Sequence, residues 1–422
     1  MIEILNILFL LFSSSILLTN IYTINLIKKI ITTKQPSLMT IFSINILILM
    51  LTMLFFSFFN INLVYFIIII FLISLIGLTK KKNAKVFLSK NNLLYLIFFL
   101  IISFIFALDL VANPKLEWDG HGWYFHAFNF NENLNFFNLV NTDRYNQPHL
   151  GGIFWGVFWN LSFLDYEFYG RLFYIILYSC AILSVSESTS KILLNRVVIS
   201  SVLIFLTYDK FLFGGYQEVL VFSIITLLCN IIFQINLRKL NITQIYFITI
   251  FSSLLLWSKN EGIIFFTIFV IYLTYFQNLK NKFVLISLSI FMILVKLYFV
   301  NLNEILEFTS KITSIYFFDI NLIYEKFKFI FIHIIIAMFK YPIWILFIFL
   351  IILKKNFKKH YDVLYFSVIS IFFIFIVYLL NDVDDYKWLV TGSLDRFIFQ
   401  ASGFLTLFIS NSISSIFRRS NN

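Results

Sequence analysis

Proline, glycine and charged side chains are all scarce in this chain of 422 residues. Only 4 prolines and 12 glycines are present, which leaves no room for a long disordered linker. Charged residues make up 13% of the sequence, about half of the roughly 25% that soluble domains contain. Apolar residues make up 60%, and 57 of all residues are phenylalanine. The composition therefore excludes a water-soluble fold, which could not cover so much apolar surface with so few charges.

Cysteine is nearly absent as well, and acidic residues are outnumbered by basic ones. Cys180 and Cys229 each fall within an apolar run, so we interpret them as small core residues and expect no disulfide there. The 32 basic and 21 acidic residues give a net charge of +11, which a nucleic-acid-binding protein would also show. The lysines, however, stand in short clusters between apolar runs, as they do in cytoplasmic loops of membrane proteins. We therefore predict no nucleic-acid partner.

Long apolar runs dominate the rest of the chain, and each span needs about 20 residues to cross the bilayer. We predict an all-α polytopic membrane protein of about 11 to 13 transmembrane helices, with no separate soluble domain. The first run carries Glu3 and has no small-residue cleavage site, so we interpret it as a span and not as a signal peptide. The shorter aromatic run 149–164 predicts an amphipathic helix at the outer surface. The spans are expected at about 4–26, 38–59, 62–79, 92–112, 166–186, 197–213, 217–237, 243–258, 261–278, 283–300, 329–353, 361–380 and 392–413.

Basic residues divide the loops between these spans into two classes. The loops after the first, third, fifth, seventh, ninth and eleventh spans, with the C-terminal tail, hold 20 of the 32 basic residues. Glu187 and Asp362 are the only acidic residues in them. Because positively charged loops stay in the cytoplasm, we predict an N-terminus outside and a C-terminus inside the cytoplasmic membrane. The other loops then face the extracytoplasmic side.

The predicted outer loops hold most of the remaining polar residues. The longest of them is 113–165, and five charged residues at outer span ends border or enter apolar runs, namely Glu218, Lys259, Glu261, Asp395 and Arg396. A charge at the centre of a membrane helix costs roughly 2.5–3.5 kcal/mol, so such groups usually pair or line a wet cavity. Single side chains can also extend to the interface. For the set, we predict a polar cavity that opens outward.

Five short motifs in these outer loops occur in an order that resembles a known family. They are EWDGHGW at 117–123, QPHLGG at 147–152, GGYQE at 214–218, SKNEG at 258–262 and TGSLDRF at 391–397. Together they resemble bacterial membrane glycosyltransferases of the GT-C fold, which are distantly related to protein mannosyltransferases and lipid-A aminoarabinose transferases. The chain departs from that pattern at His126, where a lysine is usual, and at Gln217 and Glu218, where Ala-Asp is usual.

The resemblance covers residues 92–413 and divides the chain in two. We predict a GT-C-like core at 92–422, with the catalytic outer loop at 113–165. Residues 1–91 match no part of the family pattern, so we assign them to an N-terminal extension of three spans whose role is unknown. The resemblance implies an enzyme that transfers a sugar from a polyprenyl-phosphate carrier to an acceptor on the outer side of the membrane. It identifies neither the sugar nor the acceptor.

Such a transfer needs a carboxylate to accept the proton of the acceptor hydroxyl and cations to neutralise the leaving phosphate. The resemblance assigns the base to Asp119 and a second catalytic carboxylate to Glu218. For Asp119 the alternative is a loop residue that caps the next helix. We expect phosphate ligands among Lys259, Arg396, Arg144 and His149. Asn260 and Glu261 are expected to contact substrate, and other pocket residues are expected at Trp118, His121, Tyr216 and Asp395.

Three alternatives stay open at this point. Lys259 could simply pair with Glu261, and Arg396 with Asp395 or with an acidic residue of a neighbouring segment. A divalent metal is possible, although the histidines at 121, 126 and 149 fit no compact ligand motif and we assign no metal ligand. The protein could also be a polysaccharide polymerase or ligase, or a transporter or flippase of a lipid-linked sugar, which would be expected to contain broken midplane helices.

Overall fold

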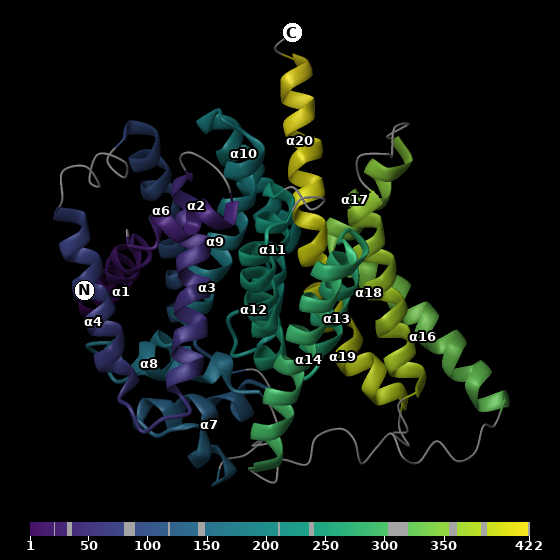
Figure 1. Ribbon diagram of the computed structural model, residues 1–422, viewed down its shortest axis with the longest axis horizontal. Helices are drawn as coiled ribbons and strands as arrows, with labels where there is room; N and C mark the ends of the chain where they lie inside the picture. The colour runs from purple at the N-terminus through teal and green to yellow at the C-terminus, as the bar shows by residue number, and fades with distance from the viewer. Residues whose placement is uncertain are drawn as a thin grey trace.

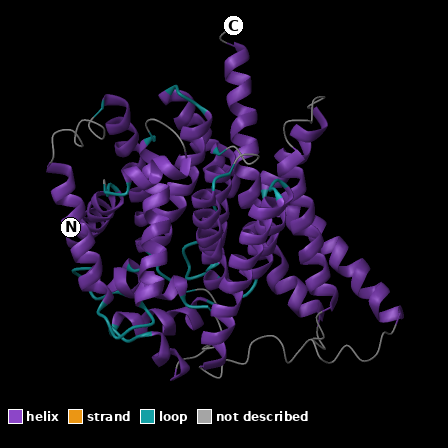
Figure 2. Ribbon diagram, in the orientation of Figure 1, coloured by secondary structure: helices purple, strands orange, loops and turns teal. Residues whose placement is uncertain are grey.

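The computed structural model contains helices and connecting loops only, in the part of the chain that it describes (Figure 2). That part comprises residues 1–20, 22–31, 36–79, 89–116, 119–141, 148–209, 212–235, 240–302, 320–353, 361–380 and 386–420. Several of its helices are apolar enough for a polytopic membrane protein, as the composition predicts.

The helices form one bundle in which the N-terminal third lies on one side and the C-terminal third on the other (Figure 1). They are α1 Ile2–Leu18, α2 Ile24–Ile31, α3 Leu38–Phe56, α4 Leu63–Thr79, α6 Lys90–Ala112, α7 Gly120–Asn131, α8 Leu150–Leu161, α9 Leu172–Thr189, α10 Leu193–Thr207, α11 Glu218–Gln234, α12 Ile242–Ser258, α13 Gly262–Tyr275, α14 Leu279–Leu302, α16 Ile320–Lys340, α17 Pro342–Leu353, α18 Tyr361–Leu380, α19 Tyr386–Ala401 and α20 Thr406–Ser420. Short 3-10 turns lie at Phe136–Asn141, Glu167–Tyr169 and Ser402–Leu405. In Figure 1, α7 and α8 lie at one end of the bundle and the C-terminus at the other.

Five helical segments of the described part are long and apolar enough to cross a membrane, and up to six if one bent pair counts as a span. These five are Leu38–Phe56, Asn91–Ala112, Glu167–Thr189, Lys280–Phe299 and Tyr386–Phe417. Seven further apolar helices have 10 to 17 residues, which is short for about 30 Å of hydrocarbon. The predicted runs are therefore helical where the structure describes them, and among those residues five or six segments have the length of a full span.

The prediction of one continuous span at 4–26 is wrong, because this segment forms two separate helices, α1 and α2. A polar group of Asn45 on α3 binds the chain at the break: its side-chain nitrogen donates to the carbonyls of Leu18 (2.7 Å) and Asn20 (3.1 Å). Its side-chain oxygen accepts from Thr23 at 2.5 Å. Asn45 thus satisfies backbone groups that the helix end leaves unpaired, and the chain can turn within the protein interior.

The predicted span 329–353 is also broken. α16 and α17 meet at an angle of 93°, with Tyr341 between them and Pro342 as the first residue of α17. Proline has no backbone N–H and fits only the first turn of a helix, so α17 can begin at Pro342 but α16 cannot continue through it.

The helix at 150–161 exists, but its predicted amphipathic surface position is wrong. Every residue from Leu150 to Trp159 is buried, and only Asn160 is exposed. α7 packs along it, and two of its glycines, Gly152 and Gly156, allow this approach: a Cβ on Gly156 would lie 2.2 Å from the carbonyl oxygen of Ala127. The helix is therefore an internal support for α7.

The core of the bundle is α9, whose residues are all buried except Ser188. It packs against α3, α6, α10, α11 and α20. Because α9 has no lipid-facing or water-facing stripe, most of its polar side chains pair inside the protein, whereas the hydroxyl of Ser179 has no partner among the described residues. Ser186, for example, contacts Tyr95 and accepts from Ser200 at 3.0 Å.

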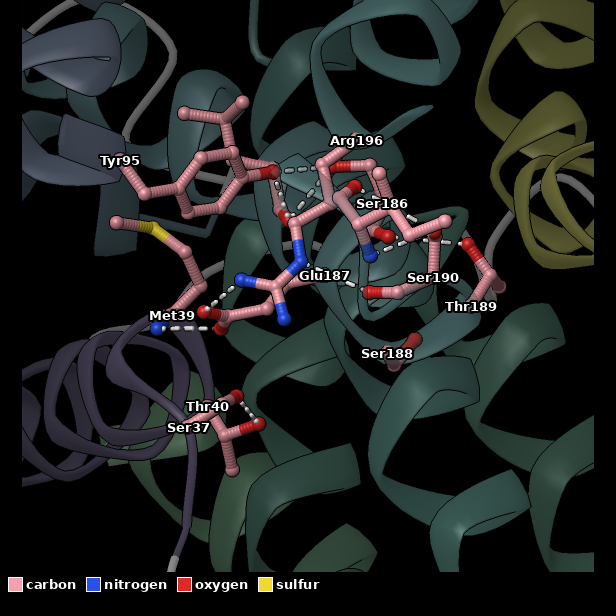
Figure 3. Close-up of polar contacts among 12 residues, drawn as sticks. Ser37, Met39, Thr40, Tyr95, Ser186, Glu187, Ser188, Thr189, Ser190 and Arg196 are labelled. Carbon is pink, nitrogen blue, oxygen red and sulfur yellow. Dashed lines mark hydrogen bonds and ion pairs between the residues drawn. The ribbon is translucent and has the colours of Figure 1, made fainter. Parts of the chain in front are cut away.

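Glu187 near the end of α9 joins three helices (Figure 3). Its carboxylate accepts the backbone N–H of Met39 at 2.7 Å and forms an ion pair with Arg196 of α10 at 3.2 Å. Met39 lies in the first turn of α3, whose own cap residue Ser37 makes no capping hydrogen bond. The negative charge therefore satisfies an unpaired N–H at the positive end of the α3 dipole and ties residues 36–56 to the core.

Candidate functional site

Five of the predicted site residues come together in one charged cluster, although they belong to four separate parts of the sequence. Arg396 of α19 forms an ion pair with Asp119 at the start of α7, and its guanidinium lies 3.5 Å from the carboxylate of Glu218. The Nζ atom of Lys259 lies 2.7 Å from the same Glu218 oxygen and 3.4 Å from Glu261. We call Asp119, Glu218, Lys259, Glu261 and Arg396 the charged cluster.

Close backbone contact brings the first outer loop onto the turn that precedes Glu218. A Cβ on Gly120 would lie 2.5 Å from the carbonyl oxygen of Gly214, so only glycine fits there. Gly215 has a φ of +94°, a conformation that other residues rarely adopt. This turn carries Tyr216, whose ring lies 5.3 Å from the guanidinium carbon of Arg396. The glycines of the two motifs thus place Asp119 and Tyr216 on either side of one cation.

Arg171 holds the same two segments together and was not predicted as a site residue. Its guanidinium is fully buried and donates to the carbonyls of Phe213 (2.9 Å), Lys115 (3.4 Å) and Pro114. Glu167, one helical turn earlier, pairs with it at 2.9 Å. The sequence could have indicated Arg171, because an ionisable residue inside a predicted membrane span usually has a functional or structural partner.

The helix-cap alternative for Asp119 does not describe what its side chain does. Asp119 occupies the residue before α7, but it makes no side-chain capping hydrogen bond. Its carboxylate instead pairs with Arg396, 277 positions later in the chain. The salt-bridge alternative for Lys259 is confirmed with Glu261 and extends to Glu218. For Arg396 the partners are Asp119 and Glu218, while Asp395 pairs with Lys340 of α16.

The charged cluster is mostly buried, and this shapes its electrostatics. Burial alone would lower the pKa of Lys259, but the carboxylates of Glu218 and Glu261 outweigh this effect and raise the pKa above its ordinary value. Lys259 therefore stays protonated. Two buried polar atoms, Oε2 of Glu218 and Nε of Arg396, have no hydrogen-bond partner among the described residues. Unsatisfied buried groups of this kind are costly and are expected where a ligand binds.

A cavity of about 230 Å³ lies beside the cluster. It is lined by Asp209, Leu212, Tyr216, Glu218, Val219, Lys340, Tyr341, Thr391, Gly392, Asp395, Arg396 and Phe399. Charged groups thus share its wall with the aromatic rings of Tyr216, Tyr341 and Phe399. A cavity with charged residues in its wall is thus present, and it collects residues from α11, α16, α19 and the segment before α11, while its opening to the outer side stays a prediction.

Of the other predicted residues, Asp395 lines the cavity, and Asn260 lies between Lys259 and Glu261 with a buried side-chain oxygen that has no partner among the described residues. His121 is exposed on α7. Trp118 and Arg144 lie outside the described residues.

His149 is fully buried among aromatic rings and does not meet the requirements of a phosphate ligand. The rings of Phe136 and Trp257 lie 4.3 and 5.5 Å from its own, and its Nε2 atom lies 3.3 Å from the hydroxyl of Ser57. Burial, with a smaller contribution from His126, holds the pKa of His149 well below its ordinary value of 6.5. The imidazole is therefore neutral, and its role in the structure is to join α3 to α8.

This burial predicts a pH-dependent stability. Below pH 6.5 the unfolded chain binds a proton at this histidine that the folded chain does not bind. The free energy of unfolding is therefore expected to decrease by about 1.4 kcal/mol for each pH unit of acidification, as the contribution of this group. The thermal midpoint of the detergent-solubilised protein between pH 7.5 and 5.5 measures the effect. His149→Gln should flatten this dependence. An unchanged slope in that variant would contradict the assignment.

Within the described ranges, no group of three or more His, Cys, Asp or Glu residues is placed to hold a metal ion. The histidines at 121, 126 and 149 thus do not assemble a metal site with Asp119 and Glu218. No family model matches the chain, and neither a curated protein nor a solved structure matches it.

Proposed function

We propose that this protein is a membrane glycosyltransferase that moves a sugar from a polyprenyl-phosphate donor to an acceptor on the outer side of the cytoplasmic membrane. The supporting observation is the convergence of two carboxylates, Asp119 and Glu218, with the cation of Arg396 beside a cavity of about 230 Å³. This reaction requires a base and an anion ligand within reach of one substrate. The five-motif resemblance to GT-C enzymes supports the same function.

The proposed step uses the cluster residues as follows. Asp119 takes the proton of the acceptor hydroxyl, whose oxygen forms a bond to the anomeric carbon of the sugar. The bond from that carbon to the carrier phosphate breaks, and the phosphate leaves with the electron pair. Arg396 neutralises the phosphate with its planar pair of donors. Because Arg396 is paired with Asp119, donor binding must draw the guanidinium away and so release the base.

The sequence suggests that Lys259 binds phosphate, but its position in the structure supports a different role. It lies between Glu218 and Glu261 and is not part of the cavity wall. Its side chain is 12% exposed, against 24% for Arg396, so a phosphate in the cavity reaches Arg396 first. We therefore propose that Lys259 positions Glu218, and that Glu218 in turn holds Arg396.

Deletion of the gene provides the first test. Mass spectrometry of cell-envelope glycans and lipid-linked sugars should show loss of one sugar from an acceptor and accumulation of its polyprenyl-phosphate form. Complementation with the wild-type gene should reverse both changes. Shorter polysaccharide chains with intact sugar units would instead indicate a polymerase or ligase, and an unchanged envelope would contradict any transfer of this kind.

The 93° break between α16 and α17 favours a second candidate, a transporter of a lipid-linked sugar. Helices broken near a binding site are typical of transporters, and this break lies at the cavity wall. Purified protein distinguishes the two functions. A transporter would move the intact lipid-linked sugar across a vesicle membrane, whereas a transferase would cleave the sugar–phosphate bond in detergent.

A further inference from the structure

Two cations line the cavity, and they differ in how firmly they are held. Arg396 is three-quarters buried and contacts two carboxylates. Lys340 is 52% exposed, and its one ion-pair partner among the described residues is Asp395, which is itself 25% exposed. An exposed pair between lysine and aspartate is weak because water screens it. The cation of Lys340 is therefore the one that a ligand can take over most easily.

The break between α16 and α17 fixes Lys340 at this position. Lys340 is the last residue of α16, and the adjacent Tyr341 contributes to the same wall and packs against Phe399 with ring centroids 5.4 Å apart. The indole N–H of Trp344 donates to the carbonyl of Ile398 at 3.2 Å and ties α17 to α19. Because α16 ends at Lys340 and the chain bends there by 93°, Lys340 and the following Tyr341 both lie at the cavity wall.

We propose that Lys340 is a further substrate-binding residue, which receives the phosphate of the lipid carrier at the mouth of the cavity by exchanging Asp395 for it. The proposal rests on the proposed function and adds a phosphate-binding residue that the sequence did not indicate. The phosphate then lies between the exposed Lys340 and the deeper Arg396, both of which line the cavity. Tyr341 and Phe399 provide apolar surface for the first carbons of the prenyl chain.

Binding of a short prenyl monophosphate to the full-length protein in detergent tests this role. Lys340→Gln is expected to weaken that affinity about tenfold and to reduce its dependence on salt. Affinity for the matching prenyl alcohol should not change. Lys328→Gln is the matched control, because Lys328 is exposed on the same helix but does not line the cavity. Asp395→Asn should strengthen phosphate binding, since it removes the competing carboxylate.

The outcomes separate this inference from the proposed function. If Arg396→Gln weakens phosphate binding and Lys340→Gln does not, the anion site stands and the role of Lys340 is wrong. If the wild-type protein binds the prenyl phosphate no better than the alcohol, both are wrong. Inorganic phosphate serves as a competitor: displacement at low concentration would show a site for free phosphate and would contradict a carrier-specific one.

Discussion

Asp119→Asn is expected to reduce sugar transfer at least a hundredfold while the protein still folds and inserts. A positioned general base contributes about 10²–10⁴-fold to a rate, and an amide cannot accept the acceptor proton. The amide oxygen can still accept a hydrogen bond from Arg396, so the contact that holds α7 to α19 is retained in a weaker form. Transfer from a radiolabelled polyprenyl-phosphate sugar in membranes that contain equal amounts of protein measures the loss.

Glu132→Gln is the matched control for this variant, because Glu132 is an exposed carboxylate at the other end of α7. It should transfer sugar at the wild-type rate. Wild-type activity in Asp119→Asn would remove Asp119 from the mechanism and leave Glu218 as the candidate base. If Asp119→Asn is inactive and also elutes as an aggregate, the ion pair is needed for folding. Asp119→Glu then tests the role of the base: it should restore folding but not full activity.

The positions of the helices could be predicted well from the sequence, because apolar runs of sufficient length leave a chain no alternative to helix in a membrane. The breaks could not. At Pro342 the proline itself indicates a break, but the apolar run around it is long enough for one continuous span, and the prediction followed the length of the run. At residues 19–23 no proline is present, and the break depends on Asn45, which binds the helix end from another helix. A helix end whose partner lies elsewhere in the chain has no local signature.

The candidate site shows the same division. The sequence predicted that Asp119, Glu218, Lys259 and Arg396 share one side of the membrane, because charge in loops follows sidedness. It predicted the local pair of Lys259 with Glu261 but did not identify the partners of Arg396, since Asp395 is adjacent to Arg396 and yet pairs with Lys340. Tertiary packing alone decides which carboxylate meets which cation. Aromatic composition was misleading for the run 149–164, because the rings of its helix, Leu150–Leu161, face the protein interior.

Arg171→Leu is expected to have the largest effect on stability, lowering the free energy of unfolding by about 3–5 kcal/mol. Removal of one partner from a buried ion pair leaves the other charge uncompensated, and here the carboxylate of Glu167 and the carbonyls of Pro114 and Phe213 all lose their donor. The thermal midpoint in detergent measures the change. Activity should fall as well, at temperatures where the variant is still folded, because the segments that carry Asp119 and Tyr216 are no longer held together.

A double variant separates these two roles of Arg171. In Arg171→Leu with Glu167→Leu the uncompensated carboxylate is gone, so part of the lost stability should return, as it does when apolar residues replace a whole buried pair. Transfer activity should not return, because the carbonyls of Lys115 and Phe213 still lack the donor that joins the two segments. Recovery of both properties would show that Arg171 only balances the charge of Glu167. Recovery of stability alone would show that the geometry of the charged cluster depends on a residue outside it.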